Sequence, residues 1–214
     1  CIRDRPITAG LVSEREALAL FLVLVGCAFL LVLALNPLTI ALSVVAALLA
    51  ASYPFSKRFT QLPQAWLGAA FGWAVPMAFT AIQGQIPVWA WVLFATTVIW
   101  ALIYDTEYAM VDRDDDLKIG IKSTAILFGR HDRLIVALLQ LLMLALLVYV
   151  GIAAERGWAY FAGLVAAALL ALYQQWLIWD RDPKRCFLAF LNNNYFGMAI
   201  FVGLVVDYLL NPVG

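Results

Sequence analysis

Charged side chains are scarce in this sequence. Asp, Glu, Lys and Arg make up 13% of its 214 residues, roughly half of the share in a typical soluble domain. There is one histidine, and the three cysteines (Cys1, Cys27 and Cys186) show no CxxC or other metal-binding spacing. This argues against a disulfide framework and a structural zinc site. No basic stretch is interleaved with aromatic residues, so no nucleic-acid partner is predicted.

Apolar residues, in contrast, make up 65% of the chain, more than one soluble core can bury. They form seven runs, each long enough to cross a bilayer, which such a run can do as a helix with its backbone hydrogen bonds satisfied internally. The runs cover residues 17–35, 38–55, 65–82, 88–106, 134–154, 158–179 and 188–210. The sequence therefore predicts an all-α, polytopic transmembrane helical bundle that forms a single domain over residues 1–214.

The basic residues predict the orientation of this bundle. One set of connections between the runs holds 13 of the 14 Lys and Arg residues, and the other set holds only Arg156. Because cytoplasmic loops carry the excess of basic residues, the first set is predicted to face the cytoplasm. Acids gather on the same side, except for Glu155 and Asp207. Both signs on one face indicate a polar site, with solvated loop ends as the alternative.

The densest group of acids follows the fourth run, over residues 104–116. If the helix continues through this segment, four polar residues recur at steps of three, four and four and share one face: Asp105, Tyr108, Asp112 and Asp116. Carboxylates stacked in this way repel one another, so this face needs a compensating cation. Oxygen ligands suit Mg²⁺, which commonly bridges to a substrate phosphate. Ca²⁺ is the nearest rival, but the segment lacks the glycine and closing glutamate of an EF-hand loop.

Other polar residues on the same side could complete such a site. Lys118 and Lys122 follow the acidic segment at i,i+4 spacing and could hold phosphate oxygens as point charges, or serve topology alone. Lys57 and Arg58, after the second run, could bind a second anion or anionic lipid headgroups. The three consecutive asparagines at 192–194 predict either a polar cavity or a helix cap.

Residues 104–125 resemble the second aspartate-rich motif of the UbiA superfamily of intramembrane prenyltransferases, most closely that of its 4-hydroxybenzoate polyprenyltransferase branch. Residues 53–58 are similar to the other conserved cytoplasmic loop of that branch. The family has nine helices and carries a first aspartate motif after its second helix. This sequence has seven runs and no such motif, so the resemblance implies that an N-terminal part with the first motif precedes residue 1.

The resemblance implies an enzyme that transfers a polyprenyl group from a polyprenyl diphosphate to the aromatic ring of 4-hydroxybenzoate, in ubiquinone biosynthesis. Mg²⁺ would bridge the diphosphate to aspartates of both motifs. Asp105, Asp112 and Asp116 match the second motif, and Asp115 is a further candidate metal ligand. The metal and nearby cations would stabilise the negative charge of the departing diphosphate.

The same resemblance implies roles for four basic residues and one tyrosine. The basic residues would neutralise the leaving diphosphate or hold the carboxylate of the acceptor, with no division between the two tasks: Lys57, Arg58, Lys118 and Lys122. Tyr108 would orient a ligand or stabilise positive charge through its ring. The prenyl tail would lie among the helices within the lipid bilayer, where apolar walls keep water from the allylic cation.

Three other functions are compatible with the sequence. A prenyltransferase with another aromatic acceptor, such as a dihydroxynaphthoate, would carry the same motif, and a scaffold without activity would keep the fold. A membrane transporter would place ionisable residues near the bilayer midplane. The acids here cluster at the ends of the runs, and only Asp207 lies well within one, which disfavours transport.

Overall fold

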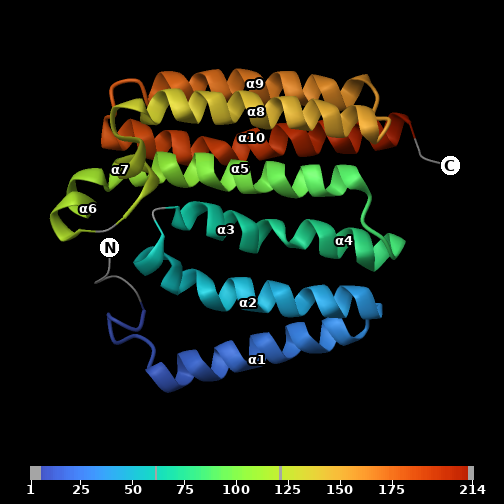
Figure 1. The fold of residues 1–214 in the computed structure, drawn as a ribbon, viewed down its shortest axis with the longest axis horizontal. Helices are drawn as coiled ribbons and strands as arrows, with labels where there is room; N and C mark the ends of the chain where they lie inside the picture. The colour runs from blue at the N-terminus through green and yellow to red at the C-terminus, as the bar shows by residue number, and fades with distance from the viewer. Residues whose placement is uncertain (1–5, 61, 121, 212–214) are drawn as a thin grey trace.

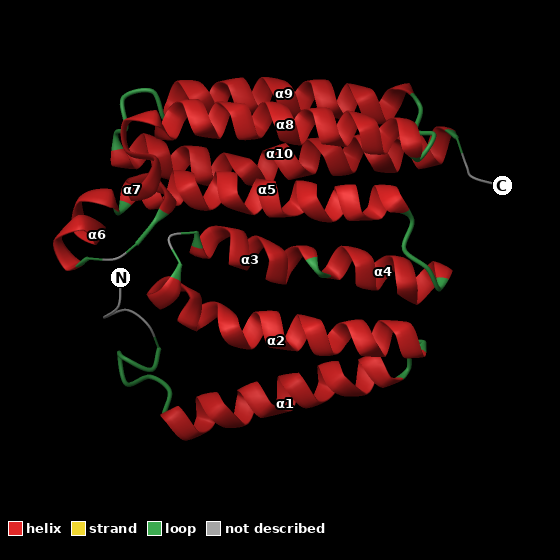
Figure 2. Ribbon diagram, in the orientation of Figure 1, coloured by secondary structure: helices red, strands yellow, loops and turns green. Residues whose placement is uncertain are grey.

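The computed structural model describes residues 6–60, 62–120 and 122–211, apart from the side chains of residues 57–59 and 119. This part of the chain is almost entirely helical and contains no strand (Figure 2). Seven spans are long and apolar enough to cross a membrane, which confirms the predicted architecture: Glu14–Leu33, Pro37–Ser56, Pro63–Gln83, Val88–Val111, Thr124–Ala153, Trp158–Leu177 and Pro183–Leu210.

Among the helices of the described residues, three begin with a side-chain cap. Their order is α1 (Glu14–Leu33), α2 (Pro37–Phe59), α3 (Pro63–Gly72), α4 (Ala74–Gln83), α5 (Val88–Val111), α6 (Arg113–Ile119), α7 (Thr124–Phe128), a 3-10 turn (Gly129–His131), α8 (Asp132–Ala153), α9 (Trp158–Leu177) and α10 (Pro183–Leu210). Side-chain oxygens of Ser13, Asn36 and Asp182 cap α1, α2 and α10 by accepting hydrogen bonds from backbone N–H groups in the first turn. Such caps satisfy donors that a helix N-terminus leaves unpaired.

The third span differs from the continuous helix predicted over 65–82. It consists of α3 and α4, which meet at Trp73. Pro76 lies in the first turn of α4, and a proline ring clashes with the carbonyl group four residues earlier, which here belongs to Gly72. The indole of Trp73 donates a hydrogen bond to the backbone oxygen of Leu42 in α2 at 3.0 Å, so the break is held against the neighbouring helix.

The spanning helices lie side by side along the long axis of the molecule (Figure 1). The buried core is formed mainly by α5, α8, α9 and α10, whereas α1 has no buried residue. Helices α9 and α10 approach very closely because Gly163 faces Gly203. A Cβ added at Gly163 would lie 2.7 Å from the backbone oxygen of Ala199. Small residues at such contacts are typical of helix packing in membranes.

The connections fall into two groups at opposite ends of the bundle (Figure 2). The start of α1, the α2–α3 connection, the short helices α6 and α7 and the α9–α10 connection lie at one end. The connections α1–α2, α4–α5 and α8–α9 lie at the other. The acidic segment and nearly all basic residues therefore share one end of the molecule, the end predicted to face the cytoplasm.

Candidate active site

The acidic segment does not continue as one helix. Helix α5 ends at Val111, and Asp112 takes a non-helical conformation with φ −95° and ψ 4°. The backbone oxygen of Asp112 accepts hydrogen bonds from the N–H groups of Asp115 at 3.1 Å and Asp116 at 2.8 Å, so the chain turns directly into α6. The conditional prediction of one shared face therefore holds for Asp105 and Tyr108 on α5, but Asp116 belongs to a separate helix.

Helix α6 is short, and its charged residues are distributed in the way that the helix dipole favours. Asp114, Asp115 and Asp116 lie in its first turn and Lys118 in its last, the arrangement that the helix dipole favours. Gly120 ends the helix in a left-handed conformation with φ +70°, where glycine carries no steric penalty. The break at Asp112 thus relieves the stacking of carboxylates along α5 and places three of them where a helix tolerates them.

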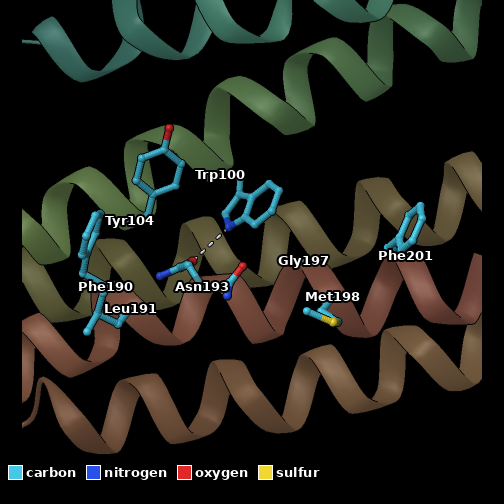
Figure 3. Close-up of a pocket in the computed structure, with 9 residues that line it drawn as sticks. Trp100, Tyr104, Phe190, Leu191, Asn193, Gly197, Met198 and Phe201 are labelled. Carbon is cyan, nitrogen blue, oxygen red and sulfur yellow. Dashed lines mark hydrogen bonds between the residues drawn. The ribbon is translucent and has the colours of Figure 1, made fainter.

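A groove of about 650 Å³ runs between α5 and α10 (Figure 3). Its lining is mostly aromatic and apolar, with two carboxamides: Trp100, Tyr104, Phe190, Leu191, Asn193, Asn194, Gly197, Met198 and Phe201. The ring of Phe190 packs edge-on against Tyr104, with centroids 6.2 Å apart, and against Tyr108 at 5.1 Å. Tyr108, which is 37% exposed, therefore continues the aromatic wall of the groove toward the acidic segment. The size is that of a small-molecule site.

Asn193 lies at the centre of a buried hydrogen-bond chain beside this groove. Its Oδ1 accepts from the indole N–H of Trp100 at 2.9 Å (Figure 3), and its Nδ2 donates to Oε2 of Glu107 at 2.7 Å. Glu107 is fully buried, and its Oε1 has no hydrogen-bond partner among the described residues. Asn194 lines the groove beside Asn193. The asparagines thus lie inside α10 rather than at its cap, which is Asp182, so the capping interpretation of the triplet is wrong, and Asn193 and Asn194 line a groove that is otherwise aromatic and apolar.

Asp105 lies within electrostatic range of two tyrosines from different helices. This aspartate acts electrostatically on the hydroxyl groups of Tyr104, its neighbour on α5, and of Tyr53, on α2. Tyr53, the first residue of the 53–58 segment, is therefore near the acidic end of α5. Lys57 and Arg58 belong to α2, but their side chains lie outside the described part of the chain.

Asp116 lies in a second, more polar pocket of about 470 Å³, formed by the segment from α6 to α7. Lys122 and Ser123 line the same pocket. Ser123 is buried, and its hydroxyl finds no hydrogen-bond partner among the described residues. A carboxylate, an ammonium group and an unpaired hydroxyl therefore surround one small space.

The remaining two predicted residues pair with each other in water. Nζ of Lys118 donates to Oδ1 of Asp115 at 2.9 Å, and both side chains are largely exposed. This hydrogen bond raises the pKa of Lys118. Within the described residues, no three His, Cys, Asp or Glu side chains are gathered closely enough to hold one metal ion by themselves. The metal and substrate roles of the aspartates and lysines remain predictions.

Two features of this end of the molecule were not predicted from the sequence. One is Glu107, whose burial follows from the packing of α5 against α10 and has no local signal. The other is Asp132, which is fully buried and bound by Arg113 and Arg181. In the sequence, Asp132 is one of two charged residues that precede a long apolar run, a position that is usually solvated.

Comparisons with known proteins show to which family the chain belongs. A sequence model of the UbiA prenyltransferase family matches residues 2–201. The 4-hydroxybenzoate octaprenyltransferase of Methylococcus capsulatus is 62% identical over 207 residues, which cover 97% of this chain and 71% of the relative. The enzyme of the same name from Alkalilimnicola ehrlichii is 61% identical over 203 residues, 95% of this chain and 69% of that one.

Two solved structures share the fold. The apo structure of a UbiA homolog from Aeropyrum pernix K1 has a TM-score of 0.82 and 25% identity, and the match covers 95% of this chain and 76% of that one. A structure of digeranylgeranylglyceryl phosphate synthase has a TM-score of 0.73 at 17% identity, over 97% and 74% of the two chains. With its seven apolar spans, its acidic segment and these matches, the chain belongs to the UbiA prenyltransferase family and is an integral membrane prenyltransferase.

Proposed function

We propose that this protein transfers a polyprenyl group from a polyprenyl diphosphate to 4-hydroxybenzoate, as a step of ubiquinone biosynthesis, and that residues 1–214 act as one transmembrane domain. The main support for the proposal is that two features lie at the same end of α5. The aspartates at that end suit a diphosphate with its metal ions, and the aromatic groove beside them suits an aromatic acid and a prenyl group. The names of the 62% and 61% identical relatives support the choice of acceptor.

The side chains of the acidic segment fit Mg²⁺ in chemical type. Asp105, Asp112 and Asp116 offer only oxygen ligands, and in phosphate sites Mg²⁺ is usually held by one or two carboxylates together with phosphate oxygens and water. The unpaired hydroxyl of Ser123 beside Asp116 and Lys122 supplies a further polar contact for a phosphate. When bound, the ion would neutralise charge on the leaving diphosphate.

The basic residues of this end are proposed to bind the anionic groups of the two substrates. Lys122, in the pocket of Asp116, is placed to hold diphosphate oxygens, and Lys57, Arg58 and Lys118 are further candidates for the diphosphate or the acceptor carboxylate. Asp115 holds Lys118 and is the least suited of the four aspartates to bind metal.

In the proposed reaction, the bond between the allylic carbon and the diphosphate oxygen breaks. The same carbon then bonds to the ring carbon ortho to the acceptor hydroxyl, and that ring carbon loses its proton. Trp100, Tyr104 and Tyr108 present aromatic rings along the groove and beside it, and such rings stabilise an allylic cation through their faces. The apolar lining excludes the water that would quench it.

The same end of the bundle is proposed to face the cytoplasm of a bacterial cell, with the protein in the inner membrane. The Lys and Arg residues that orient a membrane protein gather at the end that carries α6 and α7. A transporter is less well supported, because Asp207 is engaged in structure. It accepts a hydrogen bond from the N–H of Gly157 at 3.0 Å and lies 4.0 Å from Arg156.

The acceptor can be tested directly. Membranes that contain the enzyme are supplied with a polyprenyl diphosphate and Mg²⁺, together with either 4-hydroxybenzoate or a dihydroxynaphthoate, and the prenylated product is measured. We expect 4-hydroxybenzoate to be prenylated preferentially. Preferential prenylation of the naphthoate would assign the protein to another acceptor, and no product with either acid would remove the proposal.

A further inference from the structure

Asp132 is the first residue of α8, and its side chain is fully buried although it carries a charge. A buried carboxylate is tolerated only where charged partners and hydrogen bonds replace its water. Arg181 grips both oxygens, with Nη2 donating to Oδ1 at 2.6 Å and Nε donating to Oδ2 at 2.9 Å. Nη1 of Arg113 donates to Oδ2 at 3.3 Å, and the backbone N–H of Arg133 donates to Oδ1 at 2.7 Å.

The two arginines come from different parts of the chain. Arg113 is the first residue of α6, directly after Asp112 and before the acids of its first turn. Arg181 lies in the α9–α10 connection. Asp132 therefore joins the acidic segment, the start of α8 and the α9–α10 connection at one point.

Arg181 adopts an unusual backbone conformation in making this contact. Its φ is +56°, in the left-handed region that costs a non-glycine residue energy and persists where surrounding contacts hold it. Its guanidinium binds Asp132 bidentately and also donates to the backbone oxygen of Arg130 at 2.9 Å. Such paired hydrogen bonds to a carboxylate are among the strongest in proteins, so Asp132 is held in place independently of Arg113.

Arg113, the arginine within the acidic segment, therefore pairs with a carboxylate that Arg181 already holds in place. The side chain of Arg113 turns toward the bundle to reach Asp132 and is 28% exposed. Its neighbours Asp112 and Asp114 are exposed. Like charges so close together repel one another and favour the dispersal of the segment, and a contact between α6 and a spanning helix opposes that dispersal.

We propose that Asp132 is a positioning residue. Through Arg113 it holds α6 against the bundle, and it thereby sets where Asp112 and Asp116 lie when a divalent cation and a diphosphate bind. This inference rests on the proposed function for its ligand, but the tether itself does not. Its consequence is that weakening the tether lowers the affinity for the cation with diphosphate more than it lowers the maximal rate of transfer.

A substrate-free experiment tests the tether first. Hydrogen exchange of the backbone amides over 112–119 is compared in the intact enzyme and in Arg113→Gln, Arg113→Lys, Asp132→Asn and Asp207→Asn variants, without metal. Arg113→Gln leaves Asp132 paired with Arg181, so it is expected to fold even if Asp132→Asn does not. We expect exchange in this segment to rise about tenfold in Arg113→Gln and in Asp132→Asn. We expect a smaller rise in Arg113→Lys, which can still make one hydrogen bond.

Asp207→Asn is the matched control, because Asp207 is also buried and arginine-paired but lies in the last spanning helix, close to Gly157 of the α8–α9 connection. It should leave exchange over 112–119 unchanged. Equal exchange in Arg113→Gln and the unmodified enzyme would overturn the proposal.

Binding is measured next, with Mn²⁺ as a paramagnetic substitute for Mg²⁺ and inorganic diphosphate as the anion. The apparent dissociation constant of Mn²⁺ should rise about tenfold in Arg113→Gln and recover in part in Arg113→Lys. In transfer assays, the Mg²⁺ concentration for half-maximal rate should rise by a similar factor while the rate at saturating Mg²⁺ falls much less. Faster exchange with unchanged Mn²⁺ affinity would also overturn the positioning role. A failure of the proposed function would show separately, as a lack of product from the unmodified enzyme.

Discussion

Among the residues that the structure describes, each end of the bundle buries one aspartate, but the two are surrounded differently. Asp207 caps the start of α9 and pairs with Arg156, whose guanidinium also lies over the ring of Tyr208 at 4.3 Å. Those partners are contributed by neighbouring helix ends and complete a local structure. The carboxylate of Asp132 likewise has charged partners. One of them, Arg113, belongs to α6, whose first turn carries three further carboxylates.

This difference distinguishes charged groups that are paired within the fold from charged groups that are expected to bind a ligand. Removing one partner of a buried ion pair destabilises the fold, because the other charge is then left buried without compensation. A cluster of like charges at the surface stabilises nothing by itself, because its members repel one another. Its presence at one end of the bundle, beside an aromatic groove, is expected where a ligand supplies the missing positive charge.

The largest expected effect concerns the aspartates proposed to bind metal. Asp112→Asn and Asp116→Asn keep the size of the side chain but remove a charge, and should each lower Mg²⁺-dependent prenyl transfer by about 100-fold or more, the usual cost of losing a group that stabilises transition-state charge. Asp114→Asn, exposed in the first turn of α6, should be tolerated far better. Thermal stability, measured alongside, should change little, because removing one of several neighbouring negative charges lowers their mutual repulsion. Full activity of the first two variants would leave the segment as a solvated loop.

A smaller effect of the opposite kind is expected at the other end. Asp207→Asn weakens the pair with Arg156 and the cap on Gly157, and hydrogen bonds to charged groups contribute about 1.5–3 kcal/mol. The variant should therefore unfold at a lower temperature in detergent. Its transfer rate per folded molecule and its Mg²⁺ requirement should match those of the unmodified enzyme. A changed Mg²⁺ requirement would show that the two ends are not independent.

The smallest effect distinguishes two lysines of the acidic end. Lys118 is exposed and paired with Asp115, and such surface pairs contribute little to stability. Lys122 shares a pocket with Asp116 and Ser123. Lys122→Ala should therefore raise the KM for the polyprenyl diphosphate several-fold, whereas Lys118→Ala should change it little. The reverse order would move the diphosphate from the pocket of Asp116 to the exposed face of α6.

Local signals were sufficient for much of the fold. Apolar runs of bilayer length predicted all seven spans, because a chain in lipid must satisfy its backbone within each helix. Asn36 lies between the first two predicted runs and caps α2 by accepting a hydrogen bond from the N–H of Thr39 at 3.0 Å. Gly84 likewise ends α4 in a left-handed conformation with φ +70°. Each of these features depends on residues adjacent in the chain.

The candidate site could be predicted only in part. Its residue types and their position at the end of the fourth span were visible in the sequence, and so was the resemblance of the motif to a family. The break at Asp112 was not, since the same spacing would have continued a helix. Nor was the role of Asn193, which depends on Trp100 and Glu107 from another helix.

The sequence by itself determined the all-helical spans and the concentration of charge at one end, because both follow from hydrophobicity and from the order of residues along the chain. Tertiary structure alone decided which charges are paired and which face the site. Asp132 and Arg181 are 49 positions apart and resemble solvated residues until the helices pack. Their pairing then removes one carboxylate from the water, whereas those of α6 stay exposed or half-buried at the same end, because a buried charge is tolerated only where neighbours replace its solvent.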